Sequence, residues 1–217
     1  MFMEVNGVSL YYEKRGAGRP LILLHGNGED HTIFDQSVLV LEKRFCCYAV
    51  DSRCHGRSGD GALHYAEMAA DMLAFMEALE LSDVVFCGFS DGGIVGLLAA
   101  AQTARISTLI VCGANLSPWG VKLWTRLLIR GMNLFQNDPK LALMLREPHI
   151  SDDVLAKIRA NTLVLAGSRD VIREDETRHI ADMIPGAELS ILRGEGHGSY
   201  IIHSEKLAKL ITEYCRI

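Results

Sequence analysis

Ser90 is the residue of this 217-residue chain whose surroundings most clearly indicate chemistry. It lies at the centre of Gly88-Phe89-Ser90-Asp91-Gly92, which matches the pattern G-x-S-x-G. The residues at 84–86 are β-branched or aromatic and predict a strand, and the apolar, alanine-rich residues 94–101 predict a buried helix. Glycines on both sides of the serine let strand and helix approach without Cβ clashes. Ser90 is therefore expected to project from the top of a sheet as a nucleophile.

A chance match in a glycine-rich chain, or a phosphate-binding turn, would also produce this motif. The phosphate-binding patterns G-x-G-x-x-G and the P-loop with its lysine are both absent from the sequence. A serine hydroxyl is a weak nucleophile unless a base takes its proton, so the rest of the chain has to supply one.

The candidate base is His197, which stands between glycines in GEGHGS directly after the last predicted strand. A loop in that position can reach back over the sheet towards Ser90. A lone glycine-flanked histidine is more often structural, but its place in the chain favours the base. His203 follows one turn later and is the weaker candidate.

The base needs a carboxylate that fixes its tautomer and stabilises the imidazolium. Asp170 ends the predicted strand TLVLAGSRD and is the candidate, although it is also placed to cap the next helix. Glu174 and Asp175 are nearby rivals. The corresponding position after the preceding strand holds Asn115, which carries no charge. The order Ser90, Asp170, His197 is typical of one arrangement of the catalytic triad.

An oxyanion hole needs two backbone N–H groups aimed at one point. Asp91 offers one of them, because it follows the nucleophile at the start of a helix, where the helix dipole helps. Asn27 is expected to supply the other, from the polar, glycine-rich loop HGNGED that follows the apolar run ending in His25 and Gly26.

The elements that must position these residues alternate along the chain. Asn6-Gly7 predicts a hairpin turn near the start, and residues 204–214 predict an amphipathic helix at the end. Between them, runs typical of strands begin near residues 20, 45, 84, 107, 161 and 187. This alternation predicts an α/β fold with a mostly parallel, doubly wound sheet and helices on both faces, in a single domain over residues 1–217.

Residues 116–160 interrupt the alternation with a connection far longer than usual. They predict short helices with exposed apolar faces, rich in Leu, Met and aromatic residues. Ordinary core packing would account for such a pattern. The interpretation we favour is a small helical lid over the carboxyl ends of the strands, in which Trp119 and Trp124 line or cover the acyl pocket.

Composition narrows the class of protein. The formal net charge is -5 and no block of Lys or Arg is present, which argues against a nucleic-acid partner. No run approaches the roughly 18 apolar residues of a membrane span, and the first residues do not resemble a signal peptide, so no membrane partner is expected. The six cysteines form no C-x-x-C pair and predict small buried side chains in a reducing cytoplasm, without disulfides or a zinc site.

The motifs HGNG, DSRCHGRS, GFSDGG, GSRD and GHGS occur in the order of the α/β-hydrolase superfamily, which the chain resembles along essentially its whole length. The stretch GFSDGGIVGLLAAA, with ISTLIVCGANLS after it, resembles the biphenyl-hydrolase-like (valacyclovir-hydrolase-like) branch, whose members cleave esters. One departure is Cys54, which stands where the family's turn usually has glycine. The segment expected to form the lid is also shorter than usual.

These observations predict a serine hydrolase of a small carboxylic ester, acting through an acyl-enzyme and needing neither metal nor organic cofactor. A thioesterase, an amidase, a C–C bond hydrolase or an acyltransferase would use the same triad, and a ligand-binding protein without turnover is the alternative outside enzymes. The Asp91 carboxylate has two interpretations. Its negative charge interacts favourably with the dipole at the start of its helix. Alternatively, it pairs with a cationic group of the substrate, such as an α-amino group.

Overall fold

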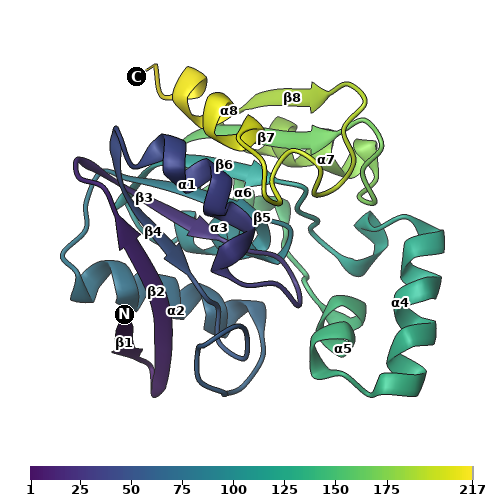
Figure 1. The fold of residues 1–217 in the computed structure, drawn as a ribbon. Coiled ribbons are helices and arrows are strands. Elements are labelled where there is room, and N and C mark those ends of the chain that lie inside the picture. Colours follow the sequence, from purple (N-terminus) through teal and green to yellow (C-terminus); the bar gives the residue numbers. More distant parts are fainter. Residues whose placement is uncertain (217) are drawn as a thin grey trace.

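The predicted alternation of strands and helices is present in the computed structural model, which describes residues 1–216 (Figure 1). The sheet formed by these residues has eight strands, β1 (Phe2–Val5), β2 (Val8–Arg15), β3 (Arg19–Leu24), β4 (Phe45–Val50), β5 (Val84–Phe89), β6 (Ile106–Cys112), β7 (Asn161–Gly167) and β8 (Glu188–Leu192). Their order in space is β1-β2-β4-β3-β5-β6-β7-β8. The pairs β1/β2 and β2/β4 are antiparallel and the others are parallel, which confirms the mostly parallel sheet.

Helices cover both faces of the sheet, as predicted. The chain's helical elements are η1 (His31–Phe34), α1 (Asp35–Leu41), α2 (Tyr65–Ala78), α3 (Asp91–Ala100), η2 (Pro118–Gly120), α4 (Leu123–Gln136), α5 (Pro139–Arg146), α6 (Asp152–Leu155), α7 (Glu174–Met183) and α8 (Lys206–Tyr214). One core forms between the sheet and α2, α3 and α7, and a second forms between the sheet and α1 and α8. None of the helices described is long and apolar enough to cross a bilayer.

The segment that interrupts the alternation contains α4 and α5, which lie at one side of the molecule beyond the carboxyl ends of the strands (Figure 1). Helix α5 lies on the inner side, towards the sheet, and α4 lies on the outer side. Short helices were expected in this segment, and α4 is the longest of them.

The turn between β5 and α3 leaves no room for side chains at its two glycines. A Cβ atom on Gly88 would lie 2.0 Å from the Gly92 carbonyl oxygen, and one on Gly92 would lie 2.1 Å from the Leu24 carbonyl oxygen. The Gly92 N–H also donates to the carbonyl oxygen of His25 (3.1 Å). The glycines of the motif therefore allow β5, α3 and the end of β3 to meet.

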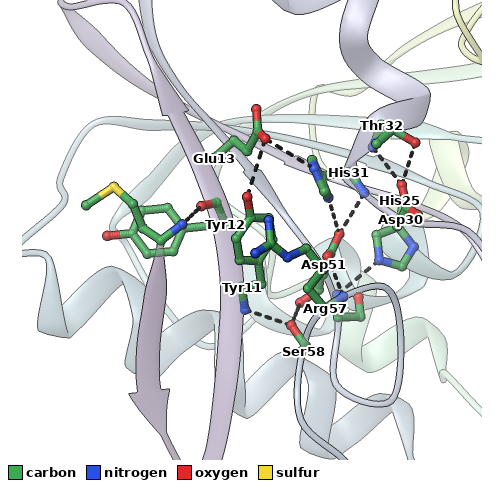
Figure 2. A network of polar contacts seen from close by, with 12 residues as sticks. Tyr11, Tyr12, Glu13, His25, Asp30, His31, Thr32, Asp51, Arg57 and Ser58 are labelled. Carbon is green, nitrogen blue, oxygen red and sulfur yellow. Dashed lines mark hydrogen bonds and ion pairs between the residues drawn. The ribbon is translucent and has the colours of Figure 1, made fainter.

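A buried polar network connects the loop after β3 with the turn after β4 (Figure 2). Asp51 directly follows β4, and its Oδ1 accepts hydrogen bonds from the backbone N–H and the Nδ1 of His31, both at 2.7 Å. The other carboxylate oxygen of Asp51 accepts from the Arg57 N–H at 2.9 Å. The side chain of Asp51 is fully buried, so these bonds hold the two connections in a fixed relation.

Cys54 lies in this same turn and adopts a φ of +62°, in the left-handed region that favours glycine. The Cys54 N–H donates to the Gly59 carbonyl oxygen (3.0 Å), and its thiol donates to the carbonyl oxygen of Gly61 (3.3 Å). Cys54 thus adopts the backbone conformation of the glycine that was expected at this position.

His25 belongs to the connection after β3 and is buried with both ring nitrogens in use. Its Nδ1 donates to the Gly26 carbonyl oxygen (2.7 Å), and its Nε2 accepts from the Ser52 N–H (3.0 Å). Burial lowers the pKa of His25 to about 4, although the bond to Gly26 acts in the opposite direction.

The pKa of His25 predicts that stability falls in mild acid. The unfolded imidazole takes up a proton near pH 6.5 and the folded one only near pH 4, so the unfolded state binds more protons between these values. The free energy of unfolding should therefore fall as the pH drops through this window, with a share from His25 of roughly 3 kcal/mol at most. Urea unfolding across the window should show a shallower dependence in His25→Gln. Equal slopes in the wild-type protein and in His25→Gln would contradict the assignment.

The close approach at Gly88 predicts a large effect of one added methyl group. Gly88→Ala should lower the free energy of unfolding by about 3 kcal/mol or more, because the contacting atoms belong to backbone and cannot move aside cheaply. Gly131→Ala is the matched control, since a Cβ there meets nothing within 4 Å and lies inside α4. That variant should be unchanged or more stable by up to about 1 kcal/mol. Similar small effects in both variants would refute the tight turn.

Candidate active site

The connections after β3 and β5, which are neighbours in the sheet, lead to opposite faces of it. The connection after β3 leads to α1 on one face of the sheet, and the connection after β5 leads to α3 on the other. Neighbouring strands whose connections diverge in this way leave a space where open α/β sheets bind their ligands. Ser90 follows β5 and Asn27 lies in the loop after β3, so both candidate residues stand at this point.

Ser90 occupies the bend between strand and helix with strained backbone angles, φ +51° and ψ −113°. Its N–H donates to the Cys112 carbonyl oxygen (2.8 Å), and its own carbonyl oxygen accepts from Gly93 and Ile94 in the first turn of α3. These bonds hold the residue in a conformation that a serine rarely adopts.

His197 joins the two other candidate residues of the triad. Its Nδ1 lies 2.6 Å from Oδ1 of Asp170, and its Nε2 lies 3.1 Å from Oγ of Ser90. The carboxylate accepts the Nδ1 proton, so the neutral ring presents an unprotonated Nε2 to the serine hydroxyl. The ring of Phe89 packs against the imidazole with centroids 4.8 Å apart. Three loops, after β5, β7 and β8, thus bring a hydroxyl, an imidazole and a carboxylate into one line of hydrogen bonds.

Gly113, directly after β6, makes room for this line and was not identified from the sequence. A Cβ at this position would lie 2.9 Å from the His197 ring and 3.3 Å from Oδ2 of Asp170. The glycine also has a φ of +61°. Asn115 lies two residues further on, and its side-chain amide donates to the Ser117 carbonyl oxygen (2.8 Å). The connection after β6 therefore supplies space to the site.

Asp170 is buried and remains ionised. Burial by itself would raise the pKa of its carboxyl group, but the hydrogen bond and charge of His197 and the N–H of Ile172 outweigh it, so the pKa lies below its usual value. Among the described residues, its Oδ2 is buried without a hydrogen-bond partner. The carboxylate therefore relies on His197 and on the Ile172 N–H, which donates to Oδ1 at 2.9 Å.

The two candidate oxyanion donors come from the loop after β3 and from the first residue of α3. Neither the Asn27 nor the Asp91 backbone N–H donates a hydrogen bond to another group within residues 1–216. Asp91 is the first residue of α3, so its N–H has no partner inside the helix. Both groups are available to a ligand at the serine.

The side chains of the same two residues are bonded to each other. The Asn27 Nδ2 donates to Oδ2 of Asp91 (2.9 Å) and to the Lys140 carbonyl oxygen in α5 (3.1 Å), and the Tyr65 hydroxyl donates to Oδ1 of Asp91 (2.8 Å). Burial raises the pKa of the Asp91 carboxyl group, and its bonds to Asn27 and Tyr65 oppose that shift. The Asp91 carboxylate thus braces the loop after β3 against α2 and α3. Neither Tyr65 nor these hydrogen bonds to Asp91 were identified from the sequence.

Glu29 is a second carboxylate beside the site that the sequence analysis did not identify. Its Oε2 accepts from the Gly26 N–H (3.0 Å) and closes the tight turn that carries Asn27. A Cβ on Gly26 would lie 2.8 Å from this oxygen and 3.0 Å from the Ser90 Cβ, so the carboxyl group is close to the nucleophile. Burial raises the pKa of Glu29. The feature of the sequence that could have indicated Glu29 is its position as an acidic residue directly after the loop glycines.

The rival acids and base lie apart from this line of hydrogen bonds. Glu174 pairs with Arg178, and Asp175 pairs with Arg173 on the surface. His203 is exposed and bonds to Asp35 (2.9 Å).

The two tryptophans assigned to the acyl pocket are both exposed. Trp119 is 67% exposed in η2 and carries the Arg126 guanidinium over its ring at 4.0 Å. Trp124 is 81% exposed on α4. The assignment of these indoles to a pocket stays a prediction.

One set of potential metal ligands occurs among the described residues, at Asp30, His31 and Asp51. Its atoms already bond to one another and to the protein. Asp51 accepts from His31 and Arg57, and Asp30 accepts from the N–H and hydroxyl of Thr32 (Figure 2). These groups are a structural network between two loops.

Known proteins are similar to this chain over nearly its whole length. The chain is 27% identical to the AB hydrolase superfamily protein YisY of Bacillus subtilis, with 95% of each chain covered. It is 25% identical to the serine hydrolase BPHL of Mus musculus over 98% of this chain and 84% of the relative. Among solved structures, the enol-lactonase from Burkholderia xenovorans superimposes over the whole of both chains with a TM-score of 0.83 at 20% identity, which shows a shared fold.

The family itself follows from the sequence profile. Residues 21–154 match the alpha/beta hydrolase family, more than half of the chain, and this match includes the loop with Asn27 and the turn with Ser90. The resemblance noted from the motifs is thereby confirmed, and the eight-stranded, mostly parallel sheet agrees with it. The chain belongs to the alpha/beta hydrolase family.

Proposed function

We propose that this protein is a serine hydrolase that cleaves small carboxylic esters through an acyl-enzyme. The observation that carries the proposal is the position of His197, with Nδ1 at 2.6 Å from Asp170 and Nε2 at 3.1 Å from Ser90. Nucleophile, base and orienting acid are within hydrogen-bond reach of one another, as nucleophilic catalysis requires. Related proteins support the reaction class, since their names include serine hydrolases and esterases.

The proposed reaction has two steps. Ser90 Oγ attacks the carbonyl carbon of the ester while its proton moves to Nε2 of His197, and the N–H groups of Asn27 and Asp91 bind the oxyanion. His197 then gives the proton to the leaving alcohol as the C–O bond breaks. A water molecule, deprotonated by the same nitrogen, hydrolyses the acyl-enzyme and releases the acid and Ser90. Every proton is handled by His197, so this chemistry requires no metal and no organic cofactor.

The segment 116–160 is proposed as a lid. Its inner helix α5 provides the Lys140 carbonyl oxygen that accepts from the Asn27 side chain, so this helix contacts the loop of the oxyanion hole directly. Lys122 lies between η2 and α4, and its Nζ donates to the Asp170 backbone oxygen (2.5 Å), so the start of the segment contacts the proposed acid. The six cysteines are free, which supports the proposed location in a reducing cytoplasm.

Thioesters, amides and C–C bonds next to a carbonyl group would meet the same triad, so an ester, a thioester and an amide of the same acyl group should be compared. A ligand-binding protein without turnover is tested by an active-site serine probe. Labelling of Ser90 that requires His197 supports an enzyme, and absence of labelling supports the binding protein.

Ser90→Ala should lower ester hydrolysis by about 10³-fold or more, because the covalent step loses its oxygen. The variant should unfold at the wild-type urea concentration, since Ser90 contributes little buried area. Turnover of p-nitrophenyl esters measures the effect. Near wild-type turnover in a folded variant would overturn the proposed nucleophile.

Asp170→Asn should lower kcat by about 10³- to 10⁴-fold, because an amide at this position favours the wrong tautomer of His197. Asp175→Asn is the matched control, since that carboxylate pairs with Arg173 at the surface. It should retain nearly full activity in the same ester assay. If the two variants ranked in the opposite order, the acid would have to be reassigned to Asp175.

The Asp91 carboxylate remains a candidate for binding a substrate amino group, and the structure adds its role as a brace. The two roles separate in Asp91→Asn when an aminoacyl ester is compared with its des-amino analogue. Recognition of the amino group predicts that the wild-type preference for the aminoacyl ester shrinks by about tenfold or more, which equals about 1.4 kcal/mol. A brace alone predicts that kcat/KM falls equally for both esters, and that result would end the recognition hypothesis.

A further inference from the structure

Helix α4 turns an apolar face to solvent. The face consists of Leu123, Trp124, Leu127, Leu128, Leu134 and Phe135, all of them exposed, with Phe135 at 92%. At 100° per residue these six side chains fall in one arc of the helix. Ile129 is the buried residue of α4 and lies on the opposite side. The helix therefore packs against the protein through the side that carries Ile129, and its apolar face is left uncovered. Helix α4 itself lies at the outer edge of the molecule (Figure 1).

Exposed apolar side chains are normally scattered singly over a protein surface, and a contiguous group marks an interaction site. Of the twelve large apolar side chains exposed among residues 1–216, eight lie between residues 119 and 135. This concentration indicates that the α4 face is an interaction surface.

The charged residues within α4 and directly before it are all of one sign. Lys122, Arg126 and Arg130 are the only charged residues between positions 116 and 137, so this stretch carries +3 in a chain whose formal net charge is -5. The remaining residues therefore carry a net charge of −8. Arg126 and Arg130 are one turn apart and line a hollow of about 300 Å³ with Trp119 and Leu145. The partner that fits is apolar where it meets α4 and anionic beside it.

A second copy of the chain fits this surface poorly. Two copies joined through their α4 faces would bring six positive charges together without an acid from either stretch. A membrane with anionic lipids presents apolar chains below a layer of negative headgroups, which matches both properties. Amphipathic helices with Trp, Leu and Phe on one side and Arg and Lys on the other lie in such an interface. The cytoplasmic leaflet of a membrane is the anionic one.

We propose that α4 docks this protein onto the surface of an anionic membrane, with its apolar face in the acyl-chain boundary and the two arginines at lipid phosphate groups. No membrane partner is expected from the sequence on the ground that no run is long enough to span a bilayer. A helix that lies in the interface needs no such length, and no described helix spans a bilayer. Helix α5 lies between α4 and the loop that carries Asn27, so the docked face is on the outer side of the proposed lid.

The experiment uses the two tryptophans of the chain, which both lie in or beside the face. Vesicles of phosphatidylcholine alone, or mixed with phosphatidylglycerol, are added to the full-length protein, and intrinsic emission and flotation are measured. Docking predicts a blue shift of the emission and flotation with the anionic vesicles, with at least tenfold weaker binding to the neutral ones. In Trp119→Phe the shift should persist, because Trp124 inserts.

Two pairs of variants test the apolar and the charged parts. Leu128→Ser with Phe135→Ser should lower binding to anionic vesicles by tenfold or more, and Leu39→Ser, an exposed leucine on α1, should not. Arg126→Gln with Arg130→Gln should remove the preference for anionic vesicles and its dependence on salt. Lys157→Gln with Arg159→Gln makes the same charge change at other exposed positions and should keep both. Circular dichroism verifies that each variant is folded.

Three results would overturn the proposal. The first is no binding to anionic vesicles by the folded wild-type protein. The second is equal loss of binding in the control variants. The third is a dimer in solution that the Leu128→Ser and Phe135→Ser changes dissociate, because a second copy would then be what covers α4. Vesicle binding is measured without a substrate, so it is independent of whether the protein cleaves esters.

Discussion

The site depends on a close backbone contact between β5, α3 and the end of β3. Gly88 and Gly92 let these elements meet at distances that no side chain permits, since a Cβ on Gly92 would lie 2.1 Å from the Leu24 carbonyl oxygen. This contact bends the chain at Ser90 and places the first N–H of α3 beside the loop after β3. Ser90 and the two N–H groups proposed for the oxyanion hole therefore take their positions from the same packing of main-chain atoms. Because main-chain atoms have few ways to move aside, this arrangement is rigid before any ligand arrives.

Three carboxyl groups stand within or beside the site, and their surroundings give them different properties. Burial acts to raise the pKa of Asp170, but the hydrogen bond and charge of His197 lower it below its usual value, so this carboxyl group is ionised at neutral pH. The pKa values of Asp91 and Glu29 are raised by burial, and the oxygens of both groups accept from neutral donors, Asn27 and Tyr65 in one case and the Gly26 N–H in the other. One buried carboxylate thus faces a histidine, while the two others shape the loop over the serine.

The sequence predicted those parts of the fold and site that depend on chain order and local pattern. Strand-like runs, the glycines around Ser90 and the place of His197 after the last strand are local signals, and the expected sheet with helices on both faces is present. Gly113 and Tyr65 could not be found in this way. Their importance comes from contacts with residues distant in the chain, His197 at 84 positions from Gly113 and Asp91 at 26 positions from Tyr65. The orientation of α4 was equally hidden, because its apolar pattern is that of any amphipathic helix, whichever side faces the protein.

The proposed role of His197 as the base also implies when, during synthesis, Ser90 gains a group that can take its proton. The histidine follows β8, which is the last strand among residues 1–216 and pairs there with β7 alone, at the sheet's edge. A nascent chain that ends before β8 already has Ser90 and the turn around it, but it has no imidazole to take the proton. Parallel strands also form slowly, because their contacts join distant residues. Under the proposed mechanism, Ser90 therefore stays a weak nucleophile on the ribosome and in any fragment that stops short of β8.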